Sequence, residues 1–237
     1  MRRALLFACA LFALPVVQAA DLHPFSASYT ADWKQLPISG TAERSLTKEA
    51  NGVWKLSFKA SMMIASLSEE STLTVDKDTL LPQSYHFARG GLGKAKKADL
   101  DFDWTAKKVT GTDRGDAVNI PLNRGMVDKS TYQLALQHDV AAGKKSMSYQ
   151  VVDDGEVDTY DFRVLGSEKV DTKAGQIDAI KVERVRDPTQ SKRTTVLWFA
   201  KDWDYLLVRL QQVETDGKEY NIMLLDGKVN GKAVKGS

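Results

Sequence analysis

Outside its first twenty residues this sequence has no cysteine, because the only cysteine among its 237 residues is Cys9. Disulfides, cysteine nucleophiles and cysteine metal ligands are therefore excluded from the rest of the chain. Histidine is almost as scarce, since His23, His86 and His138 are the only three, and no two of them have the spacing of metal ligands. Motifs of serine hydrolases and zinc peptidases are missing as well. The sequence predicts a protein that is not an enzyme and that has no metal and no cofactor.

A large net charge and a long apolar run are also missing. The formal net charge is +2, from 33 basic and 31 acidic residues, and it vanishes without Arg2 and Arg3. A balanced charge gives no long-range attraction to nucleic acid, so we expect no nucleic-acid partner. The apolar run from Ala4 to Val17 is shorter than the ~20 residues that a membrane-spanning helix needs. The chain is therefore not expected to span a membrane.

The first twenty residues are typical of a secretory signal peptide. Arg2 and Arg3 precede the apolar run, and the small residues Ala19 and Ala20 follow it at a suitable cleavage position. The bulky Phe7 and the short run before Cys9 argue against lipidation of that cysteine. We expect residues 1–20 to be removed near Ala19 or Ala20 and the protein to work in the periplasm of a Gram-negative bacterium.

Alternation of apolar and polar residues dominates the rest of the chain. Residues 25–33 (FSASYTADW) and 99–104 (DLDFDW) show it clearly. Such a pattern is typical of strands with one buried face, which belong to antiparallel sheets. Turn signals such as Asn51-Gly52 and Asp216-Gly217 separate the strands. For residues 21–226 we predict a mainly β domain, a single curved antiparallel sheet of about ten to twelve strands that forms a barrel or half-barrel.

One helix interrupts this pattern. Residues that suit one buried helix face recur at helical spacing, namely Val127, Thr131, Leu134, Ala135 and His138. Asp128 is a suitable N-cap, and the segment 141–143 (AAG) ends the helix. We expect this helix to pack against the sheet. After it the strand pattern returns and continues to about Leu225, and the Gly- and Lys-rich residues 227–237 predict a flexible tail.

Several charged clusters suggest sites but fit simpler interpretations. The row Asp99, Asp101 and Asp103 lacks the Gly and Glu of a calcium loop, so it indicates the exposed face of a strand. The acidic residues around Gly155 fit a polar hairpin tip. The segment 90–94 (GGLGK) has the wrong spacing for a phosphate loop, so it predicts a flexible loop. We assign no chemistry to these clusters.

Large aromatic residues are the more suggestive feature, because many fall on the predicted inner faces of different strands. If the sheet curls, these rings converge on one interior, which is either packed solid or hollow enough for an apolar ligand. Both alternatives remain open at this point. For the second, the candidate binding residues that would line a cavity are Trp33, Trp54, Phe102, Trp104 and, on the helix, Tyr132.

The order of these segments resembles a bacterial exported family called domain of unknown function 3108. An aromatic first strand (FSASYTADW), the segment LLP at 80–82 before QSYHFAR, and DFDW at 101–104 carry the resemblance. It continues through STYQLALQ at 130–137 to WFAKDWDYLLVRLQQVETDG at 198–217. The resemblance implies an exported, mainly antiparallel β protein and brings no catalytic residues. The architecture is also similar to periplasmic lipoprotein-carrier half-barrels, which is an analogy of fold only.

We therefore expect a non-catalytic protein of the cell envelope that binds a lipid, an acyl chain or another apolar small molecule inside the half-barrel. The alternative is a structural or interaction module with a packed interior, which binds an envelope protein partner. Exposure of Trp198 and Trp203 would favour this alternative, because large exposed apolar residues mark interfaces.

Overall fold

The computed structural model describes residues 22–33, 38–63, 65–91 and 95–237, so the expected signal peptide, residues 1–20, lies outside the described residues. Strands make up most of this part of the chain, and one helix interrupts them. The elements are β1 Phe25–Trp33, β2 Ile38–Lys48, β3 Trp54–Met62, β4 Ala65–Asp76, β5 Thr79–Gly91, β6 Lys96–Asp103, β7 Lys108–Asp113, β8 Asp116–Pro121, β9 Met126–Asp128, α1 Thr131–Ala141, β10 Ser146–Asp153, β11 Glu156–Thr172, β12 Gly175–Val185, β13 Thr194–Ala200, β14 Leu206–Val213, β15 Glu219–Val229 and β16 Lys232–Ala233.

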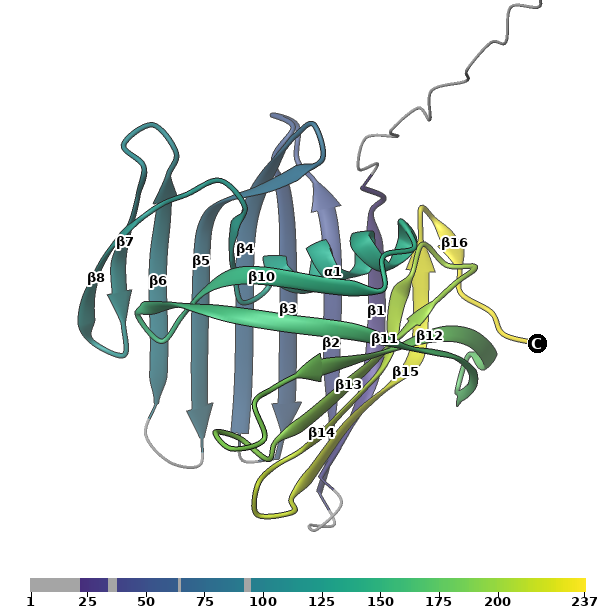
Figure 1. Cartoon of the computed structure of the whole chain (residues 1–237). Coiled ribbons are helices and arrows are strands. Elements are labelled where there is room, and N and C mark those ends of the chain that lie inside the picture. The colour runs from purple at the N-terminus through teal and green to yellow at the C-terminus, as the bar shows by residue number, and fades with distance from the viewer. Residues whose placement is uncertain (1–21, 34–37, 64, 92–94) are drawn as a thin grey trace, which may run out of the picture.

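All of these strands belong to one sheet. Its order runs from β8 stepwise to β1, continues with β15, and then runs back along the chain to β9, while β16 pairs with β15. Neighbours are antiparallel except β9, which is parallel to β10. Figure 1 shows β1–β8 as a curved wall, with β10 and β11 crossing in front of it and α1 between the two layers. Because β8 and β9 end the order of described strands and do not pair with each other, the sheet is an open half-barrel.

The predicted curved antiparallel sheet with one helix is confirmed, but the structure has sixteen strands where the sequence predicts ten to twelve. Two of the additional strands are very short. β9 has three residues and β16 has two, which is too few for an alternation to be visible. In longer strands the alternation is accurate: in β6 the apolar residues Ala98, Leu100 and Phe102 are buried, and the aspartates between them are exposed.

The interior contains three apolar clusters rather than the single aromatic interior predicted from the sequence. The first surrounds Tyr29 and Trp54, the second Tyr160 and Phe162, and the third Phe102. α1 joins two of them, because Leu134 packs into the first cluster while Leu136 and Val140 pack into the second. Among the described residues no helix is long and apolar enough to cross a membrane.

A buried carboxylate fixes the start of α1. The helix begins at Thr131, later than predicted, and its N-cap position is Ser130 instead of Asp128. Asp128 nevertheless accepts the capping hydrogen bonds: its Oδ1 accepts from the backbone N–H of Ser130 and of Thr131, each at 2.8 Å. It also accepts from the hydroxyls of Ser71 on β4, at 2.8 Å, and of Thr131, at 2.7 Å. Asp128 thus attaches the helix to the wall of the sheet.

The C-terminal segment is packed, which corrects the expected flexible tail from Gly227. That glycine lies inside β15, and the following residues form β16 and then run beside β12. Val234 is 5% exposed and belongs to the first apolar cluster. The backbone groups of Gln176 and Ser237 exchange hydrogen bonds in both directions, at 3.0 and 3.1 Å. Sequence composition suggested fraying because glycine and lysine dominate, but strand pairing orders the segment.

Deletion of residues 230–237 is therefore expected to lower the free energy of unfolding by about 2–3 kcal/mol. The burial of Val234 and several backbone hydrogen bonds are lost, and the conformational entropy that ordering these eight residues costs offsets part of that loss. Urea unfolding followed by tryptophan fluorescence measures it. Lys232→Ser, at an exposed position of β16, is the control and should have little effect. A truncated protein as stable as the full chain would show that the segment contributes nothing.

Candidate functional site

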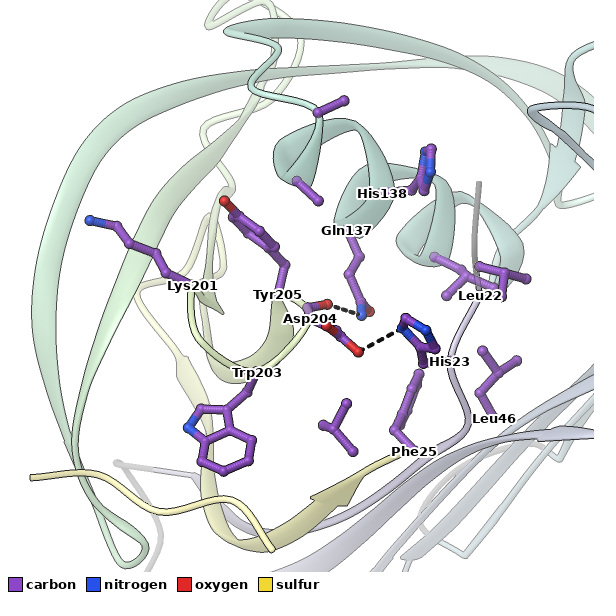
Figure 2. Close-up of a pocket in the computed structure, with 14 residues that line it drawn as sticks. Leu22, His23, Phe25, Leu46, Gln137, His138, Lys201, Trp203, Asp204 and Tyr205 are labelled. Atoms are coloured by element: carbon purple, nitrogen blue, oxygen red, sulfur yellow. Dashed lines mark hydrogen bonds and ion pairs between the residues drawn. The ribbon is translucent and has the colours of Figure 1, made fainter. Parts of the chain in front are cut away.

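A pocket of about 570 Å³ lies where the C-terminal half of α1 faces the turn between β13 and β14 (Figure 2). We call it the helix–turn pocket. The segment that leads into β1 forms its third side. Most of its walls are apolar, and they come from parts of the chain far apart in sequence. The apolar lining residues are Leu22, Phe25, Leu46, Leu134, Ala141, Ala142, Trp203 and Val229.

Strand register builds the apolar floor of this pocket. Phe25 at the start of β1 lies opposite Leu46 of β2 on one side and Val229 of β15 on the other. The three side chains therefore form a row across three neighbouring strands, on the same face of the sheet. Each is at most 6% exposed, and Leu134 of α1 belongs to the same cluster above them. A continuous apolar surface under a helix suits a ligand with an apolar body.

Three polar side chains meet at the pocket. The Nδ1 atom of His23 lies 2.8 Å from Oδ2 of Asp204, and both side chains are partly exposed. Gln137 of α1 is 7% exposed, and its Nε2 donates to the backbone carbonyl of Asp204 at 2.8 Å. Its Oε1 has no hydrogen-bond partner among the described residues. Figure 2 shows His23, Asp204 and the Gln137 amide pointing toward one another, while Lys201 extends away from them.

The turn that carries Asp204 has an unusual backbone. Asp204 and Tyr205 have φ angles of 46° and 54°, so two consecutive non-glycine residues are left-handed. This conformation is uncommon for an L-residue, above all for a bulky one, and costs on the order of 1 kcal/mol or more at each position. Surrounding contacts hold it in place: Gln137 and His23 bind Asp204, and Trp203 Nε1 donates to the carbonyl of Lys235 at 3.1 Å. Backbone strain of this kind clusters at functional sites.

The chemistry of the helix–turn pocket favours binding. The described residues that line it include no serine, threonine or cysteine. The His23–Asp204 pair therefore has no serine, threonine or cysteine of the pocket to activate as a nucleophile, and the hydroxyl that does line the pocket is the phenol of Tyr205. Gln137 instead offers a free acceptor beside an apolar floor. Such an arrangement can hold an apolar molecule and orient one polar group of it.

The predicted binding residues are elsewhere, and those whose side chains are described are divided among three apolar clusters, with Phe102 and Trp104 in the same one. Trp54 is 7% exposed in the first apolar cluster, under the Nζ atom of Lys48 at 5.4 Å from its ring. Phe102 is 3% exposed in the third cluster, where Trp104 packs against it and donates from Nε1 to the carbonyl of Pro82 at 2.6 Å. None of these rings lines the helix–turn pocket.

Tyr132 belongs to the second cluster, where its ring stacks on Phe162 with centroids 5.8 Å apart and meets Tyr160 edge-on at 5.2 Å. The side chain of Trp33 lies outside the described residues, although its backbone pairs with β2 and β15. On α1 the pocket is therefore lined by residues toward the C-terminal end and not by Tyr132. Sequence reasoning missed Asp204 and Gln137, since each is an ordinary polar residue until the fold brings it to His23.

The acidic clusters lie on an exposed strand face and at a hairpin tip, as the sequence predicts. Asp99, Asp101 and Asp103 lie on the exposed face of β6, and Asp99 pairs with Nδ1 of His86 at 2.9 Å. Near Gly155, Asp153 accepts from the Tyr160 hydroxyl and pairs with Lys129. In the part of the chain that the structure describes, no group of His, Cys, Asp or Glu side chains is arranged to hold a metal ion.

Comparison with known proteins now identifies the family. The family described as "Protein of unknown function (DUF3108)" matches residues 28–224. The chain belongs to this family. The resemblance carried by its strand and turn segments is thus confirmed. Most of the pocket-lining residues lie within the matched range, while Leu22, His23, Phe25 and Val229 lie just outside it. No curated protein matches the sequence.

A solved structure with a similar fold supports the β-barrel-like architecture of this chain. A β-barrel-like protein of domain of unknown function DUF1849 from Brucella abortus is similar with a TM-score of 0.59 and 12% identity, over 89% of this chain and 99% of that chain. A DUF1329 family protein from Desulfovibrio piger ATCC 29098 has 13% identity over 91% of this chain and 88% of that chain, with a TM-score of 0.24. At such identities the first similarity shows a shared β-barrel-like fold and nothing about activity.

Proposed function

We propose that this DUF3108 protein is a non-catalytic binding protein of the bacterial cell envelope, which holds an acyl chain or a similar apolar ligand in the helix–turn pocket. The observation that carries the proposal is the row of Leu46, Phe25 and Val229 beneath α1. This row gives the pocket an apolar floor, and the volume of about 570 Å³ falls within the usual range of small-molecule sites. The free Oε1 of Gln137 would accept a hydrogen bond from the polar end of the ligand.

The proposed compartment is the periplasm. It rests on the sequence of residues 1–20, with their basic start, apolar middle and small residues at 19 and 20. A carrier of apolar molecules has a use in this compartment, because acyl chains that leave one membrane must be shielded from water before they reach another.

One feature that would have favoured the alternative, an interaction module with a packed interior, is missing. Exposed tryptophans at 198 and 203 would have marked an interface. Trp198 is 2% exposed, and its Nε1 donates to Glu168 at 2.6 Å. Trp203 is partly buried, packs against the first apolar cluster and lines the helix–turn pocket. We therefore favour ligand binding over a docking role for these residues.

A pocket-filling substitution tests the proposal. Ala141 is exposed at the end of α1 and lines the pocket, so Ala141→Trp would occupy space that the ligand needs without creating a cavity. The probe is a dansyl-labelled undecanoic acid, whose fluorescence rises in an apolar site, and unlabelled hexadecanoate is the competitor. We expect hexadecanoate to displace the probe and Ala141→Trp to weaken probe binding by about tenfold or more.

Ala117→Trp is the matched control. Ala117 is exposed on β8, outside the helix–turn pocket, so the same substitution there should change probe affinity by less than about twofold. Equal affinity of the Ala141→Trp and Ala117→Trp variants would place the probe elsewhere and refute the proposed site. Failure of the wild-type protein to bind the probe at all would refute the carrier function.

A further inference from the structure

A second pocket, of about 410 Å³, lies at the opposite end of α1 and has a different character. One side is formed by the inner faces of β5 and β6 and by the end of β7, and the other by the end of β10. Figure 1 shows the β10–β11 hairpin reaching across to β6. Eight charged residues line this space, five of them basic, and we call it the cationic pocket. The basic residues are Arg89, Lys96, Arg114, Lys129 and Arg193.

Three of these five cations are paired with carboxylates. Arg114 pairs with Asp154, the Nζ atom of Lys129 lies 2.8 Å from Oδ1 of Asp153, and the Nε atom of Arg193 lies 2.8 Å from Oε2 of Glu214. Of these pairs, Arg114–Asp154 connects the β7–β8 turn on one side of the pocket with the β10–β11 turn on the other. The other two basic side chains of the pocket have no such carboxylate partner in the described part of the chain.

Arg89 and Lys96 form no ion pair with any described residue, and they face each other directly across β5 and β6. Two like charges opposite one another in an antiparallel pair are unfavourable, because the side chains are only about 5 Å apart at Cβ. A neutral alternative at either position would remove this repulsion. An anion bound between the two side chains would attract both of them and so offset their repulsion.

A buried hydroxyl marks the other end of the same face. Tyr85, Phe87 and Arg89 occupy alternate positions of β5, so all three point into the pocket. Tyr85 is 2% exposed, and its hydroxyl has no hydrogen-bond partner among the described residues. An unpaired buried polar group costs about 1–3 kcal/mol. Burial and nearby carboxylates raise the pKa of Tyr85, so the hydroxyl stays protonated and available as a donor.

We propose that the cationic pocket binds a small phosphate monoester with a polar organic body, of the sugar-phosphate type. Arg89 and Lys96 hold the phosphate, and the Tyr85 hydroxyl hydrogen-bonds to the body of the ligand. Two unpaired cations match the charge of about −1.5 to −2 that a phosphate monoester carries near pH 7, and arginine binds its oxygens in a bidentate manner. A carboxylate would use only one of these charges.

The dimensions favour the ester over free phosphate. Tyr85 and Arg89 are four residues apart on one strand, which places their Cα atoms roughly 13 Å from each other. A single phosphate ion cannot reach both ends of this face, whereas a hexose phosphate extends across it. The volume of about 410 Å³ also exceeds what a phosphate ion needs and lies within the range of small-molecule sites. This site is separate from the helix–turn pocket and does not depend on the function proposed for it.

Isothermal titration calorimetry of the purified protein tests this assignment, with glucose 6-phosphate, inorganic phosphate and glucose as probes in a low-salt chloride buffer. We expect glucose 6-phosphate to bind about tenfold or more tightly than inorganic phosphate and glucose to give no heat. Equal affinity for glucose 6-phosphate and inorganic phosphate would overturn the role of the organic body. Absence of heat with all three probes would overturn the site.

Single substitutions separate a specific site from general attraction of anions. Arg89→Gln and Lys96→Gln should each weaken binding of glucose 6-phosphate by about tenfold, without loss of thermal stability, since they remove a repulsion. Tyr85→Phe should weaken binding of glucose 6-phosphate but not of inorganic phosphate. Lys97→Gln is the matched control, because Lys97 is the next residue of β6 and lies on the outer face. If Lys97→Gln weakens binding as much as Lys96→Gln, the proposal is wrong.

Discussion

Replacement of Asp128 with alanine is expected to lower the free energy of unfolding by about 3–5 kcal/mol, one of the largest effects of any single substitution in this protein. The Asp128 side chain is fully buried and accepts four hydrogen bonds. Alanine would leave two backbone N–H groups and the hydroxyls of Ser71 and Thr131 without that acceptor. Each buried group that loses its partner costs about 1–3 kcal/mol. Urea unfolding followed by circular dichroism measures the change.

Two further variants show whether geometry or charge carries this effect. Asparagine can keep Oδ1 toward both backbone N–H groups and donate from its amide to the hydroxyl of Thr131, so Asp128→Asn should cost less than half as much as Asp128→Ala. Asp101→Ala, on the exposed face of β6, should change stability by less than about 0.5 kcal/mol. If Asp128→Ala is as stable as the Asp101 variant, the hydrogen bonds at the start of α1 do not anchor the helix.

The anchoring of α1 matters because the helix separates the two pockets. Lys129, just before the helix, lines the cationic pocket, while Leu134 and Gln137 line the helix–turn pocket. A helix that shifts at its N-terminus would displace side chains in both places. We therefore expect Asp128→Ala to weaken the binding of hexadecanoate and of glucose 6-phosphate together, whereas the substitutions inside one pocket affect one ligand only. This contrast separates a loss of architecture from a loss of a contact.

Much of the fold could be predicted from the sequence, because one-sided strands show their buried face in every second residue. The alternation in residues 25–33 and 99–104 locates β1 and β6, and the glycine turns locate the hairpins. The start of α1 was predicted too early, because Asp128 caps the helix from within β9. The order of the C-terminal segment was missed, since strand pairing outweighs the local preference of glycine and lysine.

The candidate sites were beyond the reach of sequence patterns for a different reason. Large aromatic side chains such as Trp54 and Phe102 contribute most to burial, so they fill the interior and do not leave space. The two pockets lie instead beside the two ends of α1, where it meets a turn or a hairpin tip. Phe25 and Val229 are neighbours only because β1 pairs with β15, and Arg89 faces Lys96 only in one strand register. A pairing between strands distant in sequence decides the helix–turn pocket, and the register of one hairpin decides which residues meet in the cationic pocket; alternation in a single sequence shows neither.

Stability is expected to fall as the pH rises from about 4.5 to about 7, and Glu69 is expected to cause about 2–3 kcal/mol of that fall. Glu69 lies on β4 beneath α1, where its Oε2 accepts a hydrogen bond from the Ser130 hydroxyl at 2.9 Å. Burial, reinforced by Asp128 and Asp153, raises the pKa of Glu69 from 4.5 to about 7, although Ser130 and Lys129 oppose the change.

Whether stability rises or falls with pH depends on which state, folded or unfolded, binds the proton of Glu69 more tightly. Below about pH 4.5 the carboxyl group is protonated in both states, so the contribution of Glu69 is fully present. Between this pH and about 7 the unfolded chain releases the proton while the folded protein keeps it, and each further pH unit costs the folded state about 1.4 kcal/mol. Above about pH 7 both states are ionised and the contribution is lost. Urea unfolding at a series of pH values measures the curve.

Glu69→Gln keeps a side chain of the same shape and removes its titration, so the variant should be more stable than the wild type at pH 8 and similar to it at pH 5. Glu43→Gln, on the exposed face of β2, is the matched control and should leave the pH curve unchanged. Parallel curves for the wild type and Glu69→Gln would mean that the folded protein holds Glu69 ionised at neutral pH. In that case Lys129 and the buried Arg44, whose guanidinium nitrogens Nη1 and Nη2 have no hydrogen-bond partner among the described residues, would be the cations that stabilise it.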